Sequence, residues 1–130
     1  METIVSVTEC MFKIDGDKWP RYYDGYIVLT NKQTIKIGIS DGQSCCEDYG
    51  HVTSEDDFEK FAGAKYLGIE LTDTNLCERK FQDMYEGGVM FVDILTDRGK
   101  LQFVTYNYHN GYYGHESVVI SKELNHEEVL

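Results

Sequence analysis

Proline, tryptophan and cysteine are scarce in this chain, which has one, one and four of them in 130 residues. Pro20 is the only proline, so no proline-rich linker divides the chain. Four cysteines are too few for a disulfide scaffold, and the adjacent pair Cys45 and Cys46 fits neither a zinc knuckle nor a redox Cys-x-x-Cys. No apolar run approaches the roughly 20 residues that span a bilayer, and Met1 is not followed by signal-peptide features. We therefore expect one cytoplasmic domain, residues 1–130, with no membrane contact.

Basic residues are also few. Lys and Arg total 12 against 23 Asp and Glu, which gives a net charge of −11. Phosphate repels such a field, so we expect no direct nucleic-acid binding. Hydrophobic residues make up 42% of the chain and aromatic residues 13%, which is enough to fill a core. The composition therefore predicts a folded, acidic domain.

The apolar pattern predicts a mainly β (α+β) fold of antiparallel hairpins with one short helix. Ile35, Ile37 and Ile39 alternate with smaller or polar residues, which is typical of a half-buried strand. The strands we expect span residues 3–14, 22–30, 33–40, 66–71, 89–95, 100–106 and 117–121, the last being the final strand. The helix is expected at residues 54–62, with Ser54 as its cap and Asp57 completing a capping box. Residues 73–88 read as a long connection.

The two predicted hairpins resemble each other, which suggests an internal pseudo-repeat. Leu29-Thr30-Asn31-Lys32 is echoed 66 residues later by Leu95-Thr96-Asp97-Arg98. A Tyr-Gly-His sequence follows each hairpin, ending at His51 and at His115, with an offset of 64. The two units would span residues 22–51 and 88–116 and place both polar loops around a pseudo-two-fold axis. We therefore predict that segments 45–51 and 109–115 lie close together; chance similarity of the hairpins is the alternative.

The two polar loops hold most of the residues that could carry chemistry. The candidate ligand-binding residues are Cys45, Cys46, Glu47, Tyr49, His51, His109, Asn110, Tyr112, Tyr113 and His115. Tyrosine rings stack and their hydroxyls donate hydrogen bonds, so a small-ligand pocket fits this composition. A cysteine activated by a histidine is a second possibility, and a hydrogen-bonded structural network is a third. No pair of residues has the spacing of a metal site, so we expect neither a metal nor a cofactor.

The same loops carry a resemblance to a known family. Ser44-Cys45-Cys46-Glu47 with Tyr49-Gly50, and later the run from His109 to His115, resemble small proteins of unknown function encoded by phages and prophages. The resemblance covers roughly residues 25 to 121 and supplies no catalytic residues. It implies an accessory protein of a bacteriophage that works in the bacterial cytoplasm, and small acidic proteins of this kind often act against host defence.

Three classes of function follow from the sequence. The first is a non-enzymatic anti-defence inhibitor whose acidic surface binds a host protein with a basic surface. The partner-binding residues would be Glu47, Asp48, Glu55, Asp56, Asp57 and Glu59. The second is a protein that sequesters a small signalling nucleotide, for which Lys32, Lys36, Arg98 and Lys100 could form a local basic patch. The third is a small Cys/His enzyme. Unpaired strand edges would also allow a homodimer.

Overall fold

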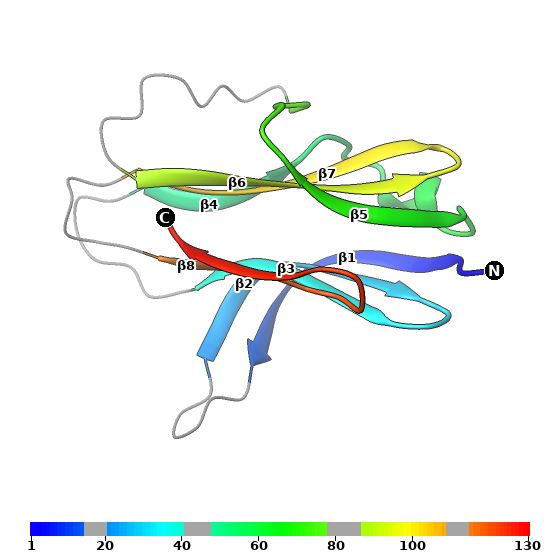
Figure 1. Cartoon of the computed structure of the whole chain (residues 1–130), viewed down its shortest axis with the longest axis horizontal. Coiled ribbons are helices and arrows are strands. Elements are labelled where there is room, and N and C mark those ends of the chain that lie inside the picture. Colours follow the sequence, from blue (N-terminus) through cyan, green and yellow to red (C-terminus); the bar gives the residue numbers. More distant parts are fainter. Residues whose placement is uncertain (15–20, 41–47, 78–86, 109–114) are drawn as a thin grey trace.

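The computed structural model describes residues 1–14, 21–40, 48–77, 87–108 and 115–130, with the backbone alone at Asp48, Gly87 and Tyr108. Two antiparallel sheets face each other, as Figure 1 shows. One sheet has the strand order β1-β2-β3-β8-β9 and the other β4-β7-β6-β5. The strands are β1 (Ile4–Ile14), β2 (Arg21–Thr30), β3 (Thr34–Ser40), β4 (Asp48–Thr53), β5 (Tyr66–Thr72), β6 (Gly87–Thr96), β7 (Gly99–Tyr108), β8 (Glu116–Ile120) and β9 (Asn125–Val129). The predicted mainly β, antiparallel fold is confirmed.

The core lies between the sheets and follows from the alternation seen in the sequence. Ile35, Ile37 and Ile39 of β3 are fully buried and pack against residues of β6 and β7 such as Ile94 and Phe103. Burying an aliphatic or aromatic side chain of this size contributes about 1.5–3 kcal/mol each. The alternation in β3 thus directs one face of this strand into the core between the sheets, while two smaller clusters, around Tyr23 and around Val104, lie apart from it.

The predicted helix is reduced to one 3₁₀ turn, η1 (Phe58–Phe61), so the expectation of a helix from Ser54 is wrong. Ser54 instead continues the pairing with β7, because its N–H donates to the Gln102 carbonyl at 3.0 Å and its Oγ accepts from the Gln102 N–H. The cap is Asp57, whose carboxylate accepts the Glu59 N–H. Phe61 is buried in the core.

The two hairpins are equivalent in register, which gives the sequence echo a structural form. Val28 pairs with Ile35 in one hairpin, and the residues 66 positions later, Ile94 and Leu101, pair in the other. The turns share one hydrogen-bond pattern. Thr30 Oγ1 accepts from the Lys32 N–H at 3.1 Å, and Thr96 Oγ1 accepts from the Arg98 N–H at 3.0 Å. Both hairpins therefore belong to repeated units of the same construction.

The repeat extends beyond the predicted units, so that β1 to β4 correspond in order to β5 to β8. β1 and β5 carry a register shift at matching points, between Ile4 and Ser6 and between Tyr66 and Gly68. A bridge from Thr3 to Lys65 joins the starts of these two strands. The fourth strands are exchanged, because β4 pairs with β7 of the second unit while β8 pairs with β3 of the first. This exchange ties the two sheets together.

Two strands were not expected from the sequence. β4 includes Tyr49-Gly50-His51, which the sequence placed in a polar loop, and β9 follows the strand that was expected to be the last. β4 and β8 occupy equivalent positions in the two units. The offset of 64 residues between the two Tyr-Gly-His sequences is therefore not the offset between equivalent residues of the structure. Thr53 pairs with Phe103 and Val119 pairs with Ile37, so the fourth strands are again 66 residues apart.

Candidate functional site

A buried tyrosine and a histidine bridge the two sheets. Tyr26 of β2 is 2% exposed, and its hydroxyl lies 2.8 Å from Nδ1 of His51 in β4. The two rings meet edge-on with centroids 4.8 Å apart. Because β4 is exchanged onto the other sheet, strand topology alone brings these side chains together. The pair occupies one side of the interface between the sheets.

Burial keeps both members of this pair uncharged near neutral pH. It raises the pKa of the Tyr26 hydroxyl and lowers the pKa of the His51 imidazole. The carboxylates of Glu9 and Asp24 act in the opposite direction on the pKa of His51, and the desolvation effect is the larger. A neutral imidazole beside a phenol can hold a hydrogen bond but adds no positive charge to its surroundings.

Acid is expected to destabilise the fold through His51. Because burial lowers the pKa of folded His51, the unfolded chain binds a proton first, and stability is lost as pH falls below about 6.5. We expect thermal melts between pH 7 and pH 5.5 to show a smaller loss in His51→Gln, which can still hydrogen-bond Tyr26. His126→Gln, on edge strand β9, is the control and should follow the wild-type curve. Parallel curves for wild type and His51→Gln would contradict this assignment.

The Tyr26–His51 pair forms the floor of a polar pocket of about 420 Å³, here called the acidic pocket. Carboxylates reach it from two separate segments, with Glu9 on β1 and with Glu55 and Asp56 on the connection from β4 to η1. Its lining residues are Glu9, Tyr26, His51, Val52, Thr53, Ser54, Glu55, Asp56 and Cys77. Glu55 is paired with Lys60, and the carboxylates of Glu9 and Asp56 beside the uncharged Tyr26 and His51 make this pocket suited to a cationic group.

The predicted proximity of the two polar segments is confirmed at their described ends. The rings of Tyr49 and His115 stack with centroids 4.0 Å apart and an interplanar angle of 21°. His115 is 3% exposed, and its Nδ1–H donates to the Ser40 carbonyl at 2.7 Å. His115 and Leu130 also exchange backbone hydrogen bonds at 2.8 and 3.1 Å. The half-buried Tyr49 and the buried His115 therefore join β4 to the segment that precedes β8.

Several predicted site residues fall outside the described residues. These are Cys45, Cys46, Glu47, His109, Asn110, Tyr112 and Tyr113, together with the side chain of Asp48. Of the predicted partner-binding acids, Asp56, Asp57 and Glu59 are exposed, while Glu55 is half-buried and bonds Lys60 Nζ at 2.8 Å. The structure brings Glu55 and Asp56 into the same pocket as His51.

The proposed basic patch is divided between the two sheets. Lys36 of β3 lies over the Phe12 ring, with Nζ 5.9 Å from the ring centroid. Arg98, in the turn between β6 and β7, donates to the carbonyls of Lys60 and Ala62 at 2.7 and 2.9 Å. These two cations belong to different sheets, and Arg98 already serves to hold η1 in place.

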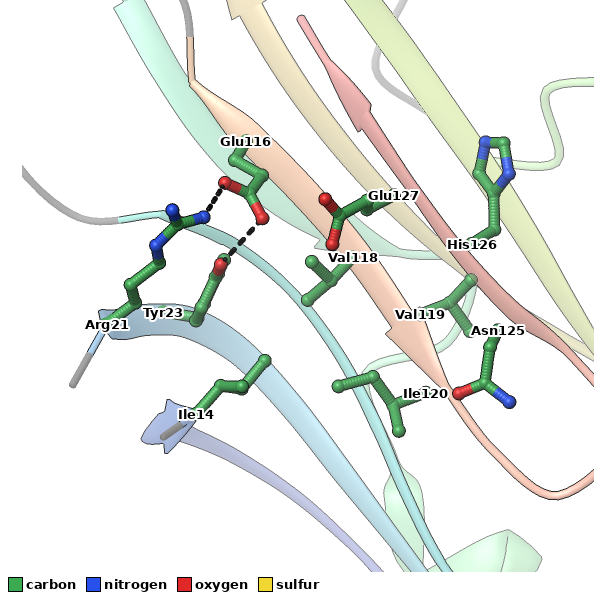
Figure 2. A pocket seen from close by; sticks show the side chains of 10 residues that line it. All are labelled: Ile14, Arg21, Tyr23, Glu116, Val118, Val119, Ile120, Asn125, His126 and Glu127. Atoms are coloured by element: carbon green, nitrogen blue, oxygen red, sulfur yellow. Dashed lines mark hydrogen bonds and ion pairs between the residues drawn. The ribbon is translucent and has the colours of Figure 1, made fainter. Parts of the chain in front are cut away.

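A second pocket, also of about 420 Å³, lies on the five-stranded sheet near the ends of β1, β2 and β9. Figure 2 shows its apolar residues, among them Ile14 and Val118, and a polar group at one end. There Glu116 accepts hydrogen bonds from Tyr23, at 3.0 Å, and from Arg21. Arg21 and Glu116 form an ion pair, and Glu127 adds one further carboxylate to the lining, so this mostly apolar pocket offers less negative charge to a cation than the acidic pocket does.

The sequence contained little signal for the residues that complete the acidic pocket. Tyr26 reads as an ordinary strand residue, and Cys77 sits in a polar stretch. Burial raises the pKa of the Cys77 thiol to about 11, so it stays protonated at neutral pH and is a poor nucleophile. Within the described ranges, no group of three or more His, Cys, Asp or Glu side chains is placed to hold a metal ion.

Comparison with known proteins identifies the family. No helix in the described part of the chain is long and apolar enough to cross a membrane. A search of curated proteins and a search of solved structures each returned no match. Residues 2–119, which include both repeated units and the acidic pocket, match the family model described as a domain of unknown function, DUF7448. The chain therefore belongs to the DUF7448 family.

Proposed function

We propose that this protein acts by binding, without turnover, and that its partner is a protein with a basic surface. The observation that carries the proposal is the acidic pocket, whose lining includes Glu9, Glu55 and Asp56 from two segments beside the uncharged Tyr26 and His51. A lysine or arginine side chain of the partner fits this arrangement, because a cation gains from the carboxylates of Glu9 and Asp56, which have no ion-pair partner among the described residues, while Glu55 is already paired with Lys60. Exposed Asp57 and Glu59 continue the negative surface beside the pocket.

The chemistry of the described residues favours binding over catalysis. The thiol in the acidic pocket, Cys77, is buried, and its raised pKa keeps it protonated. His51 already uses Nδ1 in its contact with Tyr26. A small Cys/His enzyme would need a thiolate and a base within hydrogen-bonding reach, so this alternative receives no support from Cys77.

The biological setting belongs to the same proposal. The resemblance to phage and prophage proteins implies a bacteriophage accessory protein in the bacterial cytoplasm, and an anti-defence role fits a small acidic binder. A net charge of −11 supports it, since a compact acidic protein is attracted to a basic groove that normally holds nucleic acid. Such steering acts on the association rate more than on the contacts that hold the complex.

We expect association with the partner to slow steeply as salt increases. The Debye length falls from about 8 Å at physiological ionic strength to about 3 Å at 1 M, which screens exposed charges. Asp56→Lys should reduce the association rate at low salt by roughly tenfold and leave stability nearly unchanged, because an exposed charge contributes little to folding. The measurement is a salt series of association rates with the partner recovered from bacterial lysate.

The control is Glu70→Lys, which makes the same charge change at an exposed position on β5. A partner that binds at the acidic pocket should associate more slowly with the Asp56→Lys variant than with the Glu70→Lys variant. Equal effects would mean that only net charge matters, and a flat salt series would refute the proposal. A thermal-shift screen with nucleotides tests the sequestration alternative, since a ligand of the native state raises the melting temperature.

A further inference from the structure

Strand β1 forms one edge of the five-stranded sheet and is long for an edge strand, with 11 residues. Its start is covered, because Ile4 exchanges backbone hydrogen bonds with Gly63 and Ala64. Beyond Ser6, its outer edge pairs with no strand in the described part of the chain. Figure 1 shows the far ends of β1 and β2 projecting away from the four-stranded sheet. An unpaired strand edge of this kind is a template for another strand.

The side chains along this edge alternate between two environments. Phe12 and Ile14 pack on the outer face of the sheet with Tyr23. The opposite face of the strand carries Glu9, Met11 and Lys13, all of which are exposed, Met11 at 59%. No ion pair among the described residues involves Glu9 or Lys13. Two opposite charges therefore flank an exposed apolar residue at even spacing.

We propose that a second copy of this chain pairs with β1, antiparallel and centred on Met11. In that register Glu9 of each copy lies opposite Lys13 of the other, and the two Met11 side chains meet on the same face. Opposite charges placed directly across a strand pair stabilise it, and like charges destabilise it. The pairing would join the five-stranded sheets of the two copies into one continuous sheet around a two-fold axis.

The charges select this register over its neighbours. A continuous sheet with matching faces requires each residue to pair with one of the same parity. Centring the pairing on Glu9 would place two glutamates opposite each other, and centring it on Lys13 would oppose two lysines. Centring on Cys10 places both charges opposite uncharged residues, and centring on Phe12 places Lys13 opposite Met11 and Glu9 opposite position 15, an aspartate in the sequence. Only the register centred on Met11 pairs both charges of each copy, which identifies the occupant as a second copy of the strand.

Sedimentation of the purified full chain over a concentration series tests this inference without any other partner. We expect the wild type to show a monomer–dimer equilibrium. Lys13→Glu places four carboxylates across the interface and should weaken the dimer by roughly tenfold or more. Glu9→Lys should do the same. The double variant Glu9→Lys with Lys13→Glu restores both pairs in reversed order, and we expect it to recover wild-type dimerisation.

Recovery in the double variant is the decisive result, because a general loss of folding cannot produce it. The two single changes shift the net charge of −11 in opposite directions, so weakening by both also excludes an effect of net charge. Circular dichroism should show that all three variants keep the wild-type β signal, since both residues are exposed. The inference is overturned by a wild type that stays monomeric up to about 1 mM, by a dimer insensitive to either single change, or by failure of the charge swap to restore association. Glu9 also lines the acidic pocket, whereas Lys13 does not, so the Lys13→Glu variant tests the dimer separately from the salt series that tests the acidic-pocket proposal.

Discussion

Replacing Gly25 with alanine is expected to lower the free energy of unfolding by about 3 kcal/mol, a large overpacking effect. A Cβ at this position would lie 2.0 Å from the Ile37 carbonyl oxygen and 2.6 Å from the Gly38 Cα. Both are backbone atoms, and Gly25 pairs directly with Gly38 in the register of β2 and β3. Relief therefore requires the two strands to separate. Chemical denaturation followed by circular dichroism measures the loss.

The control for this variant is Gly88→Ala on β6. There the nearest atom to a new Cβ is the Leu130 Cδ2 at 3.1 Å, the end of a flexible side chain that can turn aside. We expect a change within about 1 kcal/mol for this variant. A Gly25→Ala protein as stable as Gly88→Ala would show that β2 and β3 do not approach each other as closely as described.

The sequence predicted the parts of the fold in which side-chain burial determines structure. Ile35, Ile37 and Ile39 alternate in the sequence, and all three are fully buried. The repeated Leu-Thr-Asn/Asp turn sequences predicted equivalent hairpins, because each threonine hydroxyl makes the same bonds to its own turn. Where one face of a strand is buried and the turn residues make defined hydrogen bonds, the local sequence is sufficient to predict the structure.

The two unexpected strands are formed mainly by backbone pairing, which leaves a weak sequence signal. β9 reads Asn-His-Glu-Glu-Val, with every residue exposed or half-buried, so it has no apolar alternation. β4 carries Gly50 opposite Tyr106, a residue with low strand propensity at a position where the tyrosine hydroxyl needs space. Each strand completes a sheet edge whose register was already set by its neighbour.

The candidate site was predicted only in part, because it depends on topology. Sequence placed Tyr49 near His115 through the repeat, and their rings stack. It did not place Tyr26 beside His51, or Glu9 in the same pocket as Asp56. These contacts arise because β4 crosses to the opposite sheet, and no local pattern records that crossing.

Gln102 of β7 is fully buried. It holds the segment that follows β5 against the four-stranded sheet. Its Nε2 donates to the Thr74 carbonyl at 2.7 Å and to the Asp93 carboxylate at 2.9 Å, and its Oε1 accepts the Leu76 N–H at 2.8 Å. One amide thus satisfies two backbone groups and a buried carboxylate. It also fixes the segment that places Cys77 at the acidic pocket. Burial raises the pKa of Asp93, while the bond from Gln102 lowers it.

Gln102→Ala is expected to cost about 3–5 kcal/mol in the free energy of unfolding at pH 7, because it removes the hydrogen bond to the buried Asp93 carboxylate and those to the backbone of Thr74 and Leu76. The loss should be smaller at pH 5. A carboxyl whose folded pKa is raised stabilises the fold at low pH relative to high pH, and losing the Gln102 bond raises the pKa of Asp93 further. Denaturation curves at both pH values measure this difference.

Asp93→Asn is the matched control, because the asparagine oxygen still accepts the bond from Gln102 while the buried charge is removed. We expect this variant to be as stable as the wild type at pH 7, or more stable by about 1 kcal/mol. In the Asp93→Asn background, Gln102→Ala should cost less than in the wild type, with a loss that no longer depends on pH between 5 and 7. An equal cost in both backgrounds would mean that Gln102 acts only through Thr74 and Leu76 and that the Asp93 charge is compensated elsewhere.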